Sequence, residues 1–215
     1  MSNRSHEEET INAYTHLAWC IGSLFTLIFF VTVLDISNKG KISSLFMMGF
    51  SSWTFFSSFL YHISRGVSKK KNREIDKTSI YLMIMGCGVS INMSYTDSVV
   101  ALSSCALLIL FSVGLLAKYC KNPEGSESFS LICYVLLGWS CVLPLTEVLS
   151  PSLYGITSSS KYIILGGIFY SIGILYYSRD SIKWNHTKWH VCVMIGYLLH
   201  IIGHYKAISY SQSVF

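Results

Sequence analysis

Long apolar runs, separated by short polar segments, constrain the fold of this 215-residue chain more than any other feature. Most are close to the roughly 20 residues that a helix needs to cross the hydrocarbon core of a bilayer. A backbone in lipid must satisfy its own hydrogen bonds, so we expect each run to be a helix. The sequence therefore predicts one all-α domain over residues 1–215, a polytopic membrane protein built as a seven-transmembrane-helix bundle. The runs are Ala13–Leu34, Leu45–Ser64, Ser79–Tyr95, Val99–Ala117, Ser130–Val148, Tyr162–Tyr177 and Trp189–Ile208.

Charge supports this interpretation and predicts an orientation. Only 13% of the residues are charged, whereas soluble domains usually carry about 25%. Twelve of the 16 Lys and Arg residues fall on the N-terminal side of the predicted spans. The positive-inside rule then predicts a cytoplasmic N-terminus and an outer C-terminus, with residues 1–12 as a short acidic cytoplasmic segment. The same rule explains the net charge of +5, so we expect membrane lipids as partners, no nucleic acid, and a plasma (inner) membrane location.

Two histidines at the start of the last run form a possible metal-binding pair. His186 and His190 are four residues apart, so they lie on one face of a helix and can point at one ion. Alone, this spacing is a weak signal and favours two interfacial histidines without a metal. Spans that alternate in direction also place His62, at the end of the second run, and Asp76, before the third, on the inner side. Three imidazoles and a carboxylate at one depth suggest zinc with an open fourth position, as in catalytic sites.

Other polar residues near this level allow more than one role. Ser58 shares a helix face with His62. His16 lies about one turn inside the first run. Glu9 and Asn12 precede that run, where acids and Asn commonly favour helix N-termini, and an Asp such as Asp76 is usually an N-cap.

Two further features of the last runs have structural explanations. Gly166, Gly167 and Gly173 are spaced to let helices approach closely. His200 lies too far along the helix to share a metal with His190, at about 1.5 Å per residue. We expect His200 and His204 to be hydrogen-bonded or interfacial histidines.

The chain resembles the hemolysin III-like branch of the progestin and adipoQ receptor family, which is itself distantly similar to the alkaline ceramidases. The resemblance implies that His62, His186 and His190 bind Zn²⁺, with Ser58 and Asp76 beside them. The matching segments are E-T-I-N-A-Y-T-H (Glu9 to His16), S-F-L-Y-H (Ser58 to His62), D-K-T-S-I-Y-L-M-I-M-G (Asp76 to Gly86), G-G-I-F-Y-S-I-G (Gly166 to Gly173) and H-T-K-W-H-V-C-V-M-I-G-Y-L-L-H (His186 to His200).

The leading functional hypothesis is a zinc-dependent hydrolase of a lipid amide or ester, with its site near the inner membrane face. Asp76 would orient or deprotonate the attacking water, and Ser58 would hydrogen-bond the water or the developing oxyanion. One alternative is a pore-forming, cytolytic protein of the hemolysin III type. The other is a receptor or lipid sensor in which zinc is structural. The sequence does not fix the substrate or the oligomeric state.

Overall fold

The computed structural model describes residues 4–95, 99–121, 127–140 and 154–213. Over these residues the chain is helical and contains no strand, which confirms the all-α prediction. The helices are α1 (His6–Thr32), α2 (Asn38–Ser44), the π-helix η1 (Leu45–Gly49), α3 (Phe50–Ile63), α4 (Gly66–Tyr95), α5 (Val99–Lys121), α6 (Glu127–Ser140), α8 (Tyr154–Tyr177) and α9 (Asn185–Ser213). The predicted apolar runs lie in this helical set except for Val33, Leu34 and Ser64, which follow helix ends, and residues 141–148 of the fifth run lie outside the described residues.

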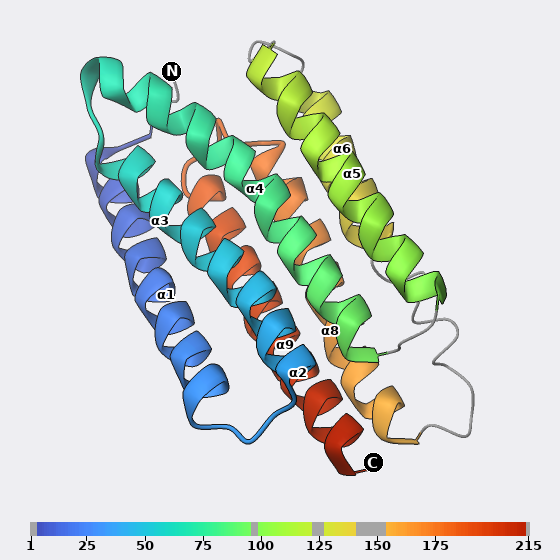
Figure 1. Ribbon diagram of the computed structural model, residues 1–215. Coiled ribbons are helices and arrows are strands. Elements are labelled where there is room, and N and C mark those ends of the chain that lie inside the picture. The colour runs from blue at the N-terminus through green and yellow to red at the C-terminus, as the bar shows by residue number, and fades with distance from the viewer. Residues whose placement is uncertain (1–3, 96–98, 122–126, 141–153, 214–215) are drawn as a thin grey trace.

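The helices stand side by side and run up and down the bundle in turn (Figure 1). The N-terminal and C-terminal ends of the chain therefore lie at opposite ends of the molecule. Helix α9 occupies the interior, because it contacts α8, α4 and α1. The largest core cluster joins these helices through buried side chains such as Cys20, Met47, Phe55, Met83, Ile163 and Tyr197.

Helix α1 begins seven residues before the apolar run that predicted it. Ser5 caps the helix, accepting from the Glu8 backbone N–H, while the Glu8 side chain accepts from the Ser5 backbone N–H. This reciprocal capping box satisfies two N–H groups that a helix start otherwise leaves unpaired. Glu9 and Asn12 consequently lie within the helix, and their side chains face the bundle.

Helix α4 corrects the expectation that Asp76 starts a helix. The basic segment after Gly66 is helical, so Asp76 sits in the third turn rather than at an N-cap. The physical reason is composition, because Lys, Arg and Glu are good helix formers and nothing between Gly66 and Asp76 interrupts them. Gly66 itself, at φ +61°, provides the turn that separates α3 from α4. The Asp76 side chain is thereby free to face the interior instead of capping a backbone.

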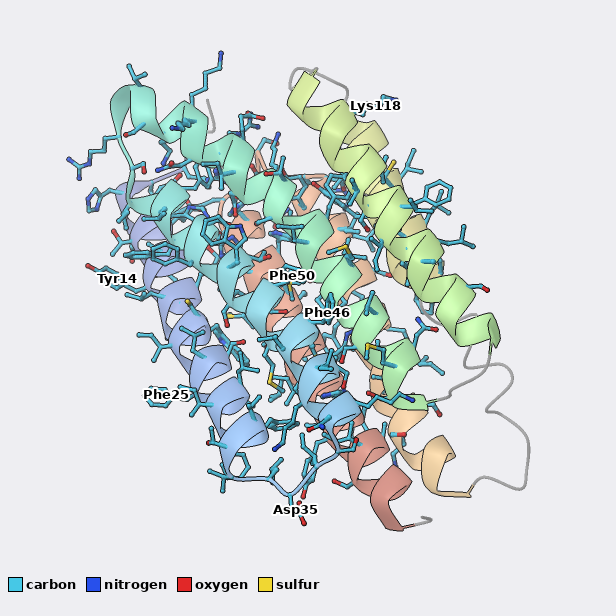
Figure 2. All side chains as sticks on the ribbon, viewed as in Figure 1. Tyr14, Phe25, Asp35, Phe46, Phe50 and Lys118 are labelled. Carbon is cyan, nitrogen blue, oxygen red and sulfur yellow. The ribbon has the colours of Figure 1, made fainter. Side chains whose placement is uncertain are left out.

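Apolar side chains cover the outside of the bundle. On α1, Tyr14 is 62% exposed and Phe25 is 69% exposed, and Figure 2 shows both pointing away from the other helices. Leu110 and Phe111 on α5 are similarly exposed. Soluble monomers rarely present so much contiguous apolar surface. Within the described residues, His6–Thr32 and Asn185–Ser209 are long and apolar enough to cross a membrane by length and composition.

Helices α8 and α9 approach closely because glycines face the neighbouring helix. A Cβ at Gly173 would lie 2.7 Å from Cε3 of Trp189 and 3.0 Å from Cβ of Cys192. A Cβ at Gly166 would overlap the His200 ring. The close-packing role predicted for these two glycines is confirmed, because a larger side chain at either position would clash with α9.

Candidate functional site

Three histidines from two helices converge at the end of the bundle that carries the N-terminus (Figure 1). His62 lies in the last turn of α3, and His186 and His190 lie in the first two turns of α9. Their exposed fractions are 4%, 5% and 2%. One ring nitrogen from each can be chosen so that all three lie within 4.8 Å of one another. The structure therefore brings together the three histidines that helix spacing and the alternation of the spans predicted to lie at one depth.

Two of the three rings are each oriented by a different carboxylate. The His62 Nδ1–H donates to Oε2 of Glu9 at 2.8 Å, and the His186 Nδ1–H donates to Oδ1 of Asp180 at 2.9 Å. Because a carboxylate only accepts, these bonds place the proton on Nδ1 and leave the lone pair on Nε2. Both Nε2 atoms are buried and have no hydrogen-bond partner among the described residues. Ring nitrogens held in this way are prepared to bind a metal ion.

Arg4 connects the two carboxylates that hold the histidines. Its Nε lies 3.1 Å from Glu9 Oε1 and its Nη1 lies 3.2 Å from Asp180 Oδ2, while Nη2 donates to the Tyr61 hydroxyl. The Arg4 side chain is only 5% exposed. Lys69 adds a further ion pair to Glu9 at 3.0 Å. The N-terminal segment before α1 is therefore part of this site.

The charges of this network support one another. Burial alone would lower the pKa of Arg4, but Tyr61, Asp180 and Glu9 outweigh burial and raise it. Burial alone would raise the pKa of Asp180, but its hydrogen bond to His186 and the Arg4 charge hold that pKa below its ordinary value. Arg4 is thus cationic and Asp180 anionic at neutral pH, which is the state that the hydrogen bonds to the rings require.

Ser58 and Asp76 lie beside the histidines in a common cavity. Ser58 is one turn before His62 on α3, and Asp76 lies on the neighbouring helix α4. Both residues line the cavity that His186 and His190 also line. The two residues therefore lie beside the histidine cluster, and their catalytic roles stay a prediction.

His16 and Asn12 occupy the α1 side of the site. The His16 ring stacks on the His190 ring, with centroids 3.8 Å apart and planes 13° apart. His16 is not one of the three residues whose ring nitrogens gather within 4.8 Å. Neither ring nitrogen of His16 and neither amide atom of Asn12 has a hydrogen-bond partner among the described residues, and both side chains are buried. His16 therefore fixes the orientation of His190 by packing.

Sequence reasoning missed two residues of this site, Asp180 and Arg4. Asp180 stands in the short connection between α8 and α9, six residues before His186. A lone Asp in an interfacial loop carries no spacing that marks it as a partner of a histidine. Arg4 stood out in the sequence only as one of the basic residues on the inner side.

The cavity extends from the histidine cluster along the interior of the bundle. It encloses about 140 Å³. Arg4, Tyr61 and Asp76 line it near the cluster, and His200 lines it far along α9. Most of the wall between these ends is apolar; its residues include Met83, Ile84, Ile91, Ile163 and Ile174. A polar site at one end of an apolar cavity suits a ligand with a polar head and an apolar chain.

The residues present fit a bound zinc ion. Three imidazoles, two of which hold a carboxylate on Nδ1, match the donor set and the outer partners of zinc sites. Two orphaned, buried Nε2 atoms are otherwise costly, and a metal ion would satisfy both. Three protein ligands also leave a fourth position open, as catalytic zinc requires.

The helical fold, the exposed apolar surface and the buried histidine cluster define a membrane protein with a site that could bind a metal ion. The chain belongs to the haemolysin-III related family, whose model matches residues 4–201. It is 25% identical to Hemolysin-3 of Bacillus cereus over 196 residues, which cover 88% of this chain and 87% of the relative. It is 26% identical to the Hemolysin-3 homolog of Bacillus subtilis over 193 residues, 88% of this chain and 89% of the relative.

Proposed function

We propose that this protein is a zinc-dependent hydrolase of a lipid amide or ester. The proposal rests on one observation, which is that a possible metal site and an apolar cavity adjoin each other. His62 and His186 present buried Nε2 atoms beside His190, and an apolar channel leads away from them. The first feature supports metal chemistry and the second supports a substrate with a hydrocarbon chain.

His62, His186 and His190 would hold the ion, with Glu9 and Asp180 fixing the rings of the first two. When bound, Zn²⁺ supplies a Lewis acid that polarises a carbonyl and makes water acidic enough to act near neutral pH.

Asp76 and Ser58 would carry the proton chemistry. Asp76 and Ser58 both line the cavity beside His186 and His190. Asp76 would take a proton from the attacking water and return it to the leaving amine or alcohol. Ser58 would hydrogen-bond the attacking water or donate to the oxyanion that forms at the substrate carbonyl.

The membrane arrangement belongs to the same proposal. The seven apolar runs would each cross the bilayer, with the N-terminus inside, in the plasma (inner) membrane. The excess of Lys and Arg beside the site supports this orientation. The histidine cluster would then lie near the inner face, and membrane lipids would reach the cavity laterally between helices.

Pore formation, the first alternative raised by the sequence, has less support. A water-filled channel needs polar residues along its wall. In the described part of the chain the cavity wall beyond the histidine cluster is mostly apolar.

The test is hydrolysis of a panel of lipid amides and esters by zinc-loaded protein in nanodiscs. We expect turnover of at least one lipid, lost in His62→Ala and kept in His6→Ala, because His6 is exposed and outside the cluster. Zinc-loaded, folded protein that cleaves none of the panel would contradict the proposed activity.

A further inference from the structure

Tyr170 and His200 pack against each other in a part of the cavity away from the histidine cluster. Each ring fits into a notch made by a glycine of the opposite helix: a Cβ at Gly196 on α9 would lie 2.9 Å from Cε1 of Tyr170, and one at Gly166 on α8 would overlap the His200 ring. The two rings meet edge to face, with centroids 5.2 Å apart and planes 80° apart. This reciprocal packing fixes both rings, and both residues line the cavity.

Each of these two side chains has a polar atom without a partner. His200 Nε2 lies 3.1 Å from the Ile163 carbonyl oxygen. Because a carbonyl only accepts, Nε2 carries the proton, and Nδ1 is left as an acceptor. His200 is 7% exposed, and neither its Nδ1 nor the Tyr170 hydroxyl has a hydrogen-bond partner among the described residues.

Two unsatisfied polar atoms at this depth need an explanation. His200 is ten residues beyond His190, which is roughly 15 Å along the axis at about 1.5 Å per residue. That distance reaches the middle of a hydrocarbon core about 30 Å thick. Polar groups buried there without a hydrogen bond destabilise the protein, so each marks a place where a ligand group is expected.

The pair presents one acceptor and one group that both donates and accepts. An aliphatic hydroxyl complements this combination, because it can donate to His200 Nδ1 and accept from the Tyr170 hydroxyl. A carbonyl or ether oxygen can only accept, so it would leave His200 Nδ1 unsatisfied. A bare hydrocarbon chain would leave both atoms unsatisfied.

We propose that Tyr170 and His200 form a subsite for a hydroxyl group on the chain of a bound lipid. The inference rests on the proposed function only for the position of the lipid head, which would lie at the histidine cluster.

Gly196, opposite Tyr170, is six residues beyond His190, so the subsite lies roughly 9 to 15 Å from the cluster. Carbon–carbon bonds of about 1.5 Å at about 111° advance a chain by roughly 1.25 Å per carbon. The hydroxyl therefore belongs about 7 to 12 carbons from the reacting carbonyl.

Binding of hydroxylated fatty acids tests the subsite without requiring catalysis. Purified protein in nanodiscs would be titrated with stearic, 2-hydroxystearic and 10-hydroxystearic acid. The 10-hydroxy acid should bind roughly tenfold more tightly than the other two, since two hydrogen bonds are made in an apolar site. In Tyr170→Phe this preference should fall to about threefold or less, with the affinity for stearic acid unchanged.

The control variant is Tyr162→Phe, on the same helix but outside the cavity wall, and it should keep the full preference. His200→Leu should also lose the preference; if it does not fold, Tyr170→Phe still decides, because it removes a single oxygen. Equal affinity of the wild type for the three acids, or no binding of any of them, would overturn the subsite. The metal-poor His62→Ala variant should retain the preference, so failure of the hydrolase proposal and failure of the subsite give different results.

Discussion

The Glu9 carboxylate accepts a hydrogen bond from the His62 ring across 2.8 Å, and this bond joins the first helix to the histidine cluster. Glu9 sits in the first turn of α1 and His62 in the last turn of α3. The bond sets the His62 tautomer and presents Nε2 to the other two histidines. Asp180 does the same for His186 from the opposite side.

Removing either carboxylate should weaken zinc binding. Glu9→Gln and Asp180→Asn should each reduce zinc affinity by about 10- to 100-fold, because orienting partners of metal-binding histidines have effects of that size. The measurement is competition with a chromophoric chelator. Glu7→Gln is the matched control, since Glu7 is in the same helix turn but exposed. Equal affinities in all of these variants would exclude an orienting role for Glu9 and Asp180.

Arg4 should affect the site through both carboxylates at once. Arg4→Ala should reduce zinc affinity by roughly tenfold or more and should change the visible spectrum of the cobalt-substituted protein, because both rings lose their support. Arg4→Lys should restore only part of the affinity, since an ammonium group lacks the planar fork that reaches two carboxylates. Arg65→Ala, at an exposed position that contacts His6, should leave the cobalt spectrum unchanged. An unaltered spectrum in Arg4→Ala would show that the network does not control the site.

Glycine substitutions should separate helix packing from helix propensity. Gly173→Ala places a methyl group against Trp189 and Cys192 and should cost about 1–3 kcal/mol of stability. Gly22→Ala has open space around it and should be neutral or stabilising by up to about 1 kcal/mol. Thermal unfolding in detergent measures both. If the two variants shift Tm in the same direction by the same amount, the close approach of α8 and α9 at Gly173 is not important for stability.

Topology is tested by reporters fused to each end of the chain. A reporter that is active only in the cytoplasm should work at the N-terminus, and one active only outside should work at the C-terminus. The reason is the excess of Lys and Arg on the side of the histidine cluster. Both ends on one side would contradict the proposed number of spans.

The histidine cluster could be predicted because it depends on large regularities. Helix periodicity places His186 and His190 on one face, and alternating spans return His62 to the same end of the bundle. The start of α4 could not be placed from hydropathy, because its first turns are charged and yet helical. Hydropathy therefore placed Asp76 at a helix start, whereas it lies in the interior of α4.

The partners of the histidines depend on contacts between segments far apart in the chain. Asp180 and Arg4 are 176 residues apart and meet only after α1, α8 and α9 have packed. No local pattern encodes that contact. The contact between Tyr170 and His200 could be predicted only in part. The sequence indicates that Gly166 lies at a close helix contact, but it does not indicate which ring packs against that glycine.

Zinc content of the purified protein tests the central claim most directly. Elemental analysis of wild type in detergent should give about one zinc per chain, and His186→Ala should have lost it, because removing one of three protein ligands leaves too weak a site. His6→Ala should match wild type. A well-folded wild type that contains no zinc and takes up none on addition would contradict the metal centre and the hydrolase proposed from it.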